Sequence, residues 1–400
     1  MRTPDENTPP PPAIDLTDTR IAFANKSDLD LLKAYWLFRV IGNRTVSSIG
    51  QAFTKAALWL HLPIKGLIKA TIFKQFCGGE TISECMGTAT KLAGSVVGTI
   101  LDHSVEGQDE EEELDATVTE VLRTITVSRE RTDVPFCVFK PTGISRTDLL
   151  EDVSEGKALD TGEAAEWARV QARMERLCQA AYDADARLLV DAEESWIQPA
   201  IDALVESMMA RFNRDRAVIF NTVQLYRHDR LAYLKQSHAR AREGGYHLGM
   251  KLVRGAYMEK ERDRAAEKGY PSPIHADKAA VDADFDAALT YCVEHVDSIA
   301  FVAGTHNEQS ALWLTRLMAA SAIPAGDERI HFAQLLGMSD HISFNLAHAG
   351  YKVAKYVPYG PVREVLPYLI RRAAENTSVA GQTSRELRLI AAERKRRRGR

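Results

Sequence analysis

The stretch from residue 299 to residue 360 decides the fold, because it contains three short apolar runs with a helical pattern between them. The runs are IAFVAGTHN (299–307), IHFAQLLG (330–337) and YKVAKYVPYG (351–360). Each is typical of a buried β-strand that ends in polar or glycine-containing sequence. Strands that alternate with helices favour a parallel sheet, since each helix returns the chain to the edge where the next strand starts. The stretch therefore predicts an α/β protein.

Five similar runs precede this stretch. They are VVGTILDHSV (96–105), PFCVFK (135–140), RLLVDAE (187–193), AVIFNTVQLY (217–226) and HLGMKLVRG (247–255). Eight strands that alternate with helices predict closure into a (βα)8 barrel, distorted from the regular form by its attachments. An open, doubly wound parallel sheet is the alternative that the pattern leaves open.

The rest of the chain divides by composition. Residues 1–20, with prolines at positions 9 to 12, predict a disordered leader, and the apolar spacing after it predicts a helical portion over 21–95. The barrel is expected over 96–385 and a basic tail over 386–400. The tail ends in RKRRRGR (394–400), which favours a solvated, frayed end over contact with an anionic membrane.

Two further segments are interpreted as structural, without a role in function. The apolar segment 52–73 carries three lysines, which favours packing in the core over membrane contact. The acidic run 109–113 is interpreted as a solvated loop.

Bulk composition limits the classes of protein to consider. The 400 residues are 45% hydrophobic and 26% charged, with a net charge of −4, which is ordinary for a globular protein and predicts no nucleic-acid partner. The five cysteines have no CxxC pair, which argues against a zinc site and fits a reducing compartment. No apolar run is long enough for a membrane span, and the start of the chain lacks the features of a signal or transit peptide.

Polar side chains gather where the predicted strands end. In a parallel barrel these ends surround one mouth, where barrel enzymes carry out their chemistry. The residues at these ends are Lys140, Asp191, Glu193, Glu194, Gln224, Arg254, Tyr257, His306, Asn307, Gln334 and Tyr356. Each has a structural interpretation as well, such as an ion pair of the barrel wall for Lys140, and the sequence does not choose between them.

The helix predicted after the last strand carries two neighbouring arginines in PYLIRRAAEN (367–376). An apolar stripe leaves Arg371, Arg372 and Glu375 on the remaining surface of the helix. One interpretation is an exposed helix with an Arg–Glu pair. The other is a clamp for a carboxylate, because guanidinium groups bind carboxylates through paired donors.

Several motifs together resemble the proline dehydrogenase family, in its monofunctional, mitochondrial-type branch. They are IAFANKSD (21–28), FCGG (76–79), KLVRGAYMEKER (251–262), GTHN (304–307), FAQLLGMSDHISF (332–344) and KYVPYGPVREVLPYLIRRAAEN (355–376). The resemblance implies a barrel that binds FAD at its mouth, under the last helix. It implies that L-proline is oxidised to Δ1-pyrroline-5-carboxylate, by hydride transfer to flavin N5, and that a quinone takes the electrons.

The resemblance also implies roles for individual residues. Lys140, Arg371 and Arg372 would bind the proline carboxylate, and Glu375 would orient the arginines near the flavin. The residues implied around the substrate ring are Tyr257, Leu335 and Tyr356. The residues implied at FAD are Asp191, Gln224, Lys251, Arg254, Lys278 and His306, with the role of Asp191 open. Relatives that oxidise hydroxyproline carry a smaller residue at the position of Tyr356, so this tyrosine favours proline.

Lys251 and Arg254 depart from the bifunctional bacterial relatives, which have arginine and lysine at these two positions. KLVRGAY (251–257) is the form of the mitochondrial-type branch, and it leaves open which cation lies nearer the flavin.

Other functions are weaker alternatives. They are hydroxyproline oxidation, a Schiff-base aldolase that uses Lys140, and a docking protein that uses the basic tail. A quinone acceptor implies peripheral contact with a membrane. The expected location is the cytoplasm or the cytoplasmic face of a bacterial inner membrane, or the mitochondrial inner membrane in a eukaryote.

Overall fold

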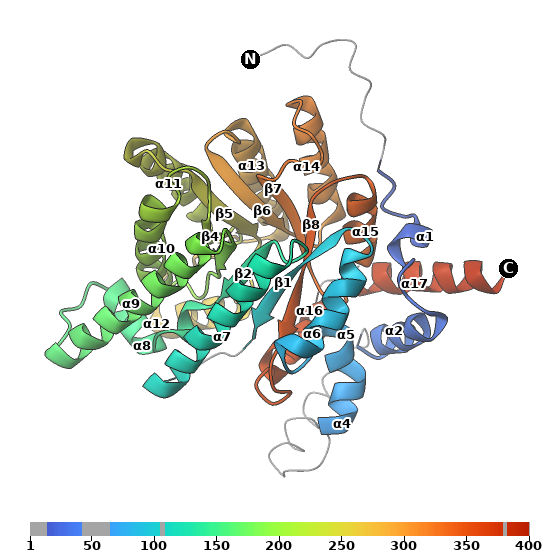
Figure 1. Cartoon of the computed structure of the whole chain (residues 1–400), viewed down its shortest axis with the longest axis horizontal. Coiled ribbons are helices and arrows are strands. Elements are labelled where there is room, and N and C mark those ends of the chain that lie inside the picture. The colour runs from blue at the N-terminus through green and yellow to red at the C-terminus, as the bar shows by residue number, and fades with distance from the viewer. Residues whose placement is uncertain (1–13, 42–64, 105–108, 379–381, 400) are drawn as a thin grey trace.

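The computed structural model describes residues 14–41, 65–104, 109–378 and 382–399, and all eight predicted strands form within these ranges (Figure 1). The strands are β1 (Val97–His103), β2 (Phe136–Phe139), β3 (Arg187–Val190), β4 (Ile219–Gln224), β5 (Leu248–Val253), β6 (Ile299–Gly304), β7 (Ile330–Leu335) and β8 (Val353–Tyr359). They form a closed barrel in the order of the sequence, and every neighbouring pair is parallel. The predicted α/β barrel is confirmed.

Pairing between the first and last strands closes the barrel. β1 pairs with β8 over its whole length, from Val97 opposite Val353 to His103 opposite Tyr359. A doubly wound sheet would leave two unpaired edges, so this pairing excludes the open-sheet alternative.

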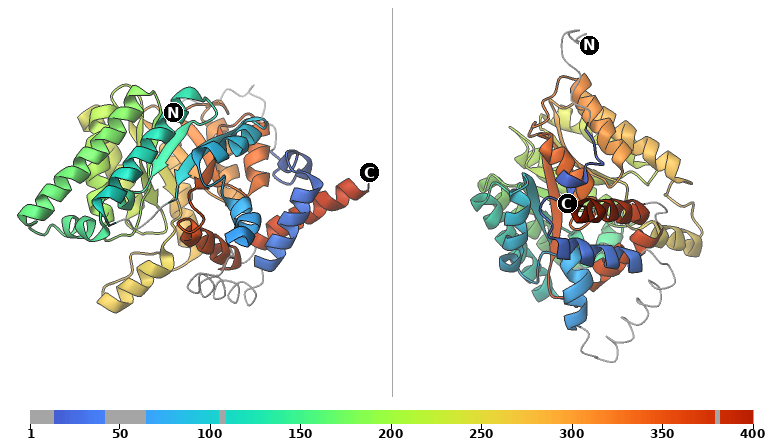
Figure 2. Two further views of the ribbon diagram at one scale, coloured as in Figure 1. Left: turned by 60° about the horizontal axis from the view of Figure 1, so that its bottom comes forward. Right: turned by 90° about the vertical axis from the view of Figure 1, so that its right-hand side faces the viewer.

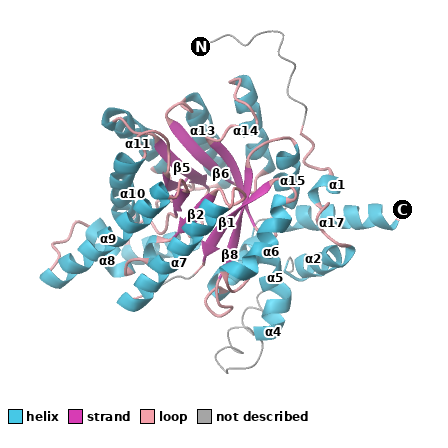
Figure 3. Ribbon diagram, viewed as in Figure 1, coloured by secondary structure: helices cyan, strands magenta, loops and turns pink. Residues whose placement is uncertain are grey.

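Helices form the outer layer of the barrel, as Figure 3 shows in cyan around the magenta strands. They are α7 (Glu111–Glu130), α8 (Thr147–Ser154), α9 (Thr161–Asp183), α10 (Gln198–Phe212), α11 (Arg230–Gly244), α12 (Met258–Lys268), α13 (Lys278–Glu294), α14 (Glu308–Ala320) and α15 (Asp340–His348). A short 3₁₀ turn, η2 (Pro141–Gly143), directly follows β2. The largest apolar core lies between this layer and the strands.

Alternate residues of each strand point into the barrel, and this sorts apolar from polar positions. Ile100, Phe136, Leu189 and Ala354 belong to the apolar cluster inside the barrel. Two or four residues further along, the same alternation places Asp102, Lys140 and Asp191 on the inner side at or just after the ends of their strands, and Tyr356 on the inner side in the middle of β8. The pleat of the strands therefore directs polar groups from several strands into one mouth.

A second apolar core joins the two ends of the chain. The N-terminal helices are α1 (Thr19–Ala22), α2 (Asp28–Ile41), α4 (Lys65–Ile68), the π-helical turn η1 (Lys69–Phe73), α5 (Lys74–Phe76) and α6 (Ile82–Ala93). The C-terminal helices are α16 (Leu366–Ser378) and α17 (Gln382–Arg398). Leu31 and Phe38 of α2 are buried in one cluster with Leu369 of α16 and Ile390 of α17. Figure 2 shows α2 and α17 on the same side of the barrel.

The structure refines the boundaries expected at the chain ends. Residues 1–13 of the leader lie outside the described residues, but Leu16 is already buried and α1 begins at Thr19. The basic tail differs from the expected frayed end. It is helical to Arg398 and buries Glu393 completely, where the carboxylate accepts hydrogen bonds from Thr19, Arg396 and Arg397.

Two internal segments can also be compared with what the sequence predicted for them. Residues 52–64 of the apolar segment 52–73 lie outside the described residues, and 65–73 are helical. The acidic run 109–113 is not only a loop, because Glu111, Glu112 and Glu113 form the first turn of α7. Carboxylates are favourable there, where the N–H groups of a helix are unpaired. Glu111 also forms ion pairs with Arg169 and Arg173 of α9.

Candidate active site

A buried polar cluster lies at the mouth of the barrel, at the ends of β3, β5 and β8. The Nζ of Lys251 forms an ion pair with Asp191 and donates a hydrogen bond of 2.8 Å to the hydroxyl of Tyr356. Burial, together with the charges of Asp191 and Asp102, raises the pKa of Tyr356 well above its usual value, so its phenol keeps its proton. Lys251 therefore fixes the position of the Tyr356 hydroxyl.

Lys140 lies beside the same cluster, directly after β2. Its Nζ is 4.0 Å from a carboxylate oxygen of Asp102 and 4.0 Å from one of Asp191. Asp102, at the end of β1, also accepts a hydrogen bond of 2.8 Å from Ser104. Lys140 and Lys251 thus face Asp102 and Asp191, and these four charges balance. A carboxylate ligand would need further positive charge at the mouth.

Asp102 was not singled out in the sequence, although it ends a predicted strand. The alternation of β1, with buried Ile100 two residues earlier, could have identified it.

Arg254 is held at the edge of the mouth by three side chains. Its guanidinium donates to Asp282 at 2.8 Å, to Thr305 at 2.8 Å and to Ser310 at 2.9 Å. The next residue, Gly255, has φ of 140°, and a Cβ there would lie 2.4 Å from the ring of Tyr226. Glycine after Arg254 is therefore required by sterics. The second cation of KLVRGAY points away from the Lys251 cluster, toward β6, α13 and α14.

His306 is a buried, neutral histidine at the end of β6. Its Nδ1 lies 2.9 Å from the hydroxyl of Ser339. Burial, and then the positive charges of Lys355 and Arg372, lower the pKa of His306 to about 3. The imidazole is therefore uncharged near neutral pH and can accept or donate one hydrogen bond at each nitrogen.

Arg372 of α16 is one of the charges that lower the pKa of His306. Arg372 is only 7% exposed, and its guanidinium lies 5.2 Å from the ring centroid of Tyr368. Arg371 is half-buried. The interpretation of this helix as an exposed surface is wrong for Arg372, which is buried. Glu375 lies in α16, but its side chain is outside what the structure describes.

Gln224 and Glu193 form a hydrogen-bonded support beneath the mouth. Thr142 donates to the carboxylate of Glu193 from its backbone N–H at 2.8 Å and from its hydroxyl at 2.7 Å. Gln224 donates to the backbone oxygen of Glu193 at 2.6 Å and accepts from the N–H of Ala256 at 3.2 Å. Burial raises the pKa of Glu193 to about 7. The sequence predicted Glu193 only as one of several polar residues at the ends of strands. Its hydrogen bonds to Thr142, in the loop that follows Lys140, were not predicted.

The remaining predicted residues lie around the same mouth, with different exposure. Tyr257 precedes α12 and is half-buried, and Leu335 ends β7 between two apolar clusters. Lys278 is exposed at the start of α13, where it forms an ion pair with Asp282, the partner of Arg254. Lys278 is therefore joined to the other predicted residues only through Asp282.

The described ranges hold no group of three or more histidine, cysteine or acidic side chains that is arranged to bind a metal ion. No described helix is long and apolar enough to cross a membrane.

Comparison with known proteins identifies similar sequences over most of the chain. The sequence profile described as Proline dehydrogenase matches residues 85–385. The carbapenem antibiotics biosynthesis protein CarD of Pectobacterium carotovorum subsp. carotovorum is 37% identical over 82% of this chain and 85% of its own length. The human protein named proline dehydrogenase 1, mitochondrial, is 43% identical over 57% of this chain and 38% of its own length.

A solved structure has the same fold. Proline utilization A of Bdellovibrio bacteriovorus, inactivated by N-propargylglycine, superposes with a TM-score of 0.72 at 18% identity. It covers 92% of this chain, but the chain spans only 39% of that protein.

Proposed function

Because the chain belongs to the proline dehydrogenase family, we propose that it is an oxidoreductase that converts L-proline to Δ1-pyrroline-5-carboxylate with FAD as its cofactor. In this proposal it catalyses the first step of proline catabolism and passes the electrons to a quinone. The observation that carries the proposal is the arginine pair of α16, in which Arg372 is buried and its charge acts on His306 at the end of β6.

The substrate carboxylate would bind to the two arginines together with Lys140. Lys140 lies 4.0 Å from a carboxylate oxygen of Asp102 and of Asp191. Arg371 and Arg372 would add positive charge, and their planar donors match a carboxylate. A substrate held at one end in this way has a fixed orientation, which lowers the entropic part of the barrier to reaction.

The residues near His306 fit an anionic dinucleotide. The largest charge effects on this buried imidazole are positive, namely those of Lys355, Arg372, His341 and Arg254. Gln224, Arg254, His306 and Lys278 would hold FAD, with Lys251 and Asp191 on the substrate side. When bound, FAD would accept a hydride from the substrate at its N5 atom. The protein then supplies binding, orientation and a positive field.

Tyr356 would set the specificity for proline. Its hydroxyl is fixed by Lys251 at 2.8 Å, and its side chain is 8% exposed, so the ring has little freedom to move aside. With Tyr257 and Leu335 it would pack against the substrate ring and leave no room for the hydroxyl of hydroxyproline. We therefore favour proline over hydroxyproline as the substrate.

The proposed quinone acceptor brings the chain to a membrane as a peripheral protein. The location in this proposal is the cytoplasmic face of a bacterial inner membrane, or the mitochondrial inner membrane in a eukaryote.

The test begins with the absorbance spectrum of the purified protein. A flavin spectrum that bleaches on addition of L-proline is expected, and a colourless protein that does not bind added FAD contradicts the proposal. Arg371→Met and Arg372→Met should each raise the KM for proline by about 10- to 100-fold, from the loss of charge-assisted hydrogen bonds, while flavin stays bound. Arg363→Met is the matched control, because Arg363 is exposed just before α16. An unchanged KM in both variants would refute the clamp.

A Schiff-base aldolase is disfavoured by the position of Lys140. A lysine must be uncharged to attack a carbonyl, and Lys140 lies beside two carboxylates, which suits an ammonium. Covalent trapping of a carbonyl substrate on Lys140 by borohydride would reverse this conclusion.

The match to CarD supports a second role for the same oxidation. That relative is matched over more of its own length than the human protein, and its name places it in antibiotic biosynthesis. Deletion of the gene separates the two roles. Loss of growth on proline as the nitrogen source indicates catabolism, whereas normal growth on proline favours the biosynthetic role.

A further inference from the structure

Helix α2 is apolar on two opposite faces, but the described structure buries only one of them. Leu31 and Phe38 are each 1% exposed and pack in the second apolar core. On the other side, Leu29 is 58% exposed, Trp36 54% and Val40 49%. These three, with Leu32 between them, follow the spacing of one helix face. We call Leu29, Leu32, Trp36 and Val40 the α2 face.

The α2 face has the side chains that are typical of a membrane–water interface. The guanidinium of Arg39 lies 5.3 Å from the ring centroid of Trp36, and the ring of Tyr35 meets that of Trp36 edge-on at 5.7 Å. Tryptophan, tyrosine and arginine favour the level of the lipid headgroups, because each combines an apolar body with a polar end.

The surface continues from α2 into a cavity of about 1280 Å³ between α2, α5 and α16. Leu32, Trp36 and Val40 line it together with Leu369 and Ile370, the neighbours of the arginine pair. The residues that line it do not include Lys140, Asp191 or Tyr356 of the mouth. A contiguous exposed apolar surface of this kind often marks a site of interaction with a partner or a membrane.

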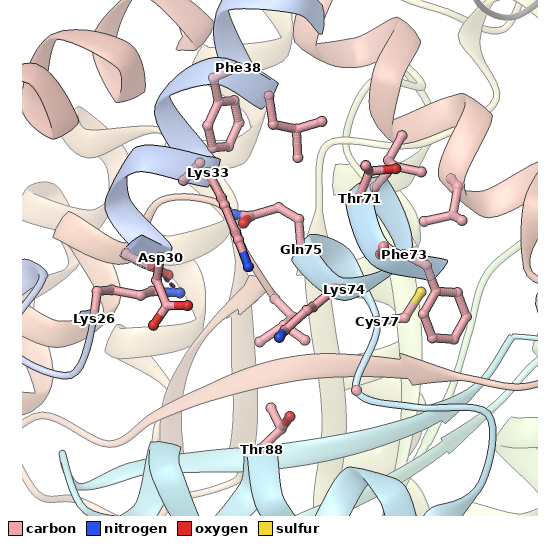
Figure 4. A pocket seen from close by; sticks show the side chains of 18 of the residues that line it. Lys26, Asp30, Lys33, Phe38, Thr71, Phe73, Lys74, Gln75, Cys77 and Thr88 are labelled. Carbon is pink, nitrogen blue, oxygen red and sulfur yellow. Dashed lines mark ion pairs between the residues drawn. The ribbon is translucent and has the colours of Figure 1, made fainter. Parts of the chain in front are cut away.

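Positive charge accompanies the apolar surface. Figure 4 shows the side chains of Lys33, from α2, and Lys74, from α5, extending into the cavity. Within the described part of the chain neither lysine has an ion-pair partner, whereas the acids nearby are paired. Those pairs are Glu80 with Lys69, Asp30 with Lys91, and Asp28 with Arg397. The last turn of α17, Lys395 to Arg398, is basic as well.

We propose that the α2 face, with Lys33 and Lys74, docks on an anionic lipid bilayer. Apolar side chains would enter the interface while the lysines meet lipid phosphates, which is the arrangement of helices that lie in a membrane surface. The inference deepens the proposed transfer of electrons to a quinone and rests on it for its purpose. It names a surface different from the two segments considered in the sequence, the basic tail and residues 52–73.

Binding to vesicles tests the apolar half of the proposal. The full chain is mixed with vesicles of phosphatidylcholine and phosphatidylglycerol, and bound protein is measured by sedimentation. The triple variant Leu29→Gln/Trp36→Gln/Val40→Gln should bind at least about tenfold more weakly, from the loss of buried apolar area. Trp313→Gln is the matched control, because Trp313 is 37% exposed on α14, on the barrel, and it should bind like the wild type.

Two results would overturn the apolar half. One is unchanged vesicle binding by the triple variant. The other is a large drop in its melting temperature without lipid, because that would mean that the α2 face packs against protein.

A second variant tests the charge. Lys33→Gln/Lys74→Gln should weaken binding to the mixed vesicles by about 30-fold, because two lysines near an anionic surface lose their attraction to lipid phosphates. Vesicles of phosphatidylcholine alone should bind the wild type weakly and should not distinguish it from this variant. Equal binding to both kinds of vesicle contradicts an anionic partner.

The oxidation of proline with a soluble dye as acceptor separates this inference from the proposed function. The α2-face variants should keep that activity. A wild type that binds vesicles but lacks flavin and dye activity would refute the proposed function and leave the docking surface standing.

Discussion

Lys355 and Asp340 form a buried ion pair on the outer side of β8, and its removal gives a sharp test of the structure. Lys355 is fully buried, and its Nζ lies 2.8 Å from Asp340. It also donates to the backbone oxygens of Met338 at 2.7 Å and Leu335 at 3.3 Å. The pair therefore fixes the segment between β7 and α15, which also carries the serine that contacts His306.

The expected loss of stability depends on which buried charge each variant leaves without its partner. Lys355→Met keeps the length of the side chain but leaves Asp340 with Lys26 as its remaining cation, at 3.4 Å and partly exposed. Breaking a buried pair costs about 3–5 kcal/mol, and the remaining contact with Lys26 favours the lower end, about 3 kcal/mol. Asp340→Asn should cost about the same. The double variant removes both charges and should cost at least about 2 kcal/mol less than the sum of the two.

Equilibrium unfolding in urea of the four proteins measures these free energies. The slope of the free energy with urea should be the same in all four, which checks that the comparison is valid. The reasoning is refuted if Lys355→Met costs less than about 1 kcal/mol, or if the two single costs add in the double variant.

Three further predictions concern pH, the support of the site and specificity. Burial lowers the pKa of His341, but Glu308 and Glu386 outweigh it and raise that pKa to about 9, so His341 stabilises the fold fully below pH 6.5 and loses this effect as the pH rises through 9. The free energy of unfolding, measured in urea, should fall by about 3 kcal/mol between pH 6.5 and pH 9. His341→Gln should remove most of this dependence on pH. Glu193→Gln cannot accept both hydrogen bonds from Thr142 and should raise the KM for proline about tenfold, whereas an unchanged KM would mean that the support does not matter. Tyr356→Ser should raise the ratio of kcat/KM for hydroxyproline to that for proline by at least about tenfold, and an unchanged ratio would exclude this residue as the determinant.

The sequence determined the barrel and much of its mouth. Strand-like runs and helical stretches are local patterns, set by which side chains are apolar and at what period, so eight alternating runs predicted a parallel sheet and favoured its closure. Only the pairing of β1 with β8 excluded the open sheet. Since alternate strand residues share a face, the same patterns also brought Lys140, Asp191 and Tyr356 to one end.

Only the tertiary structure decided which polar groups are paired and which surfaces are covered. The basic run at the C-terminus is polar by composition, yet α17 packs on α2, where Arg397 meets Asp28 at 2.8 Å. Helices from the other end of the chain pack on α16, where Leu369 is buried in one cluster with Leu31 and Phe38 of α2. Such partners lie hundreds of residues apart in the sequence, so the local spacing of apolar residues does not predict their contacts. The spacing of α2 likewise predicted a helix, but which of its two apolar faces is buried depended on where the rest of the chain packs.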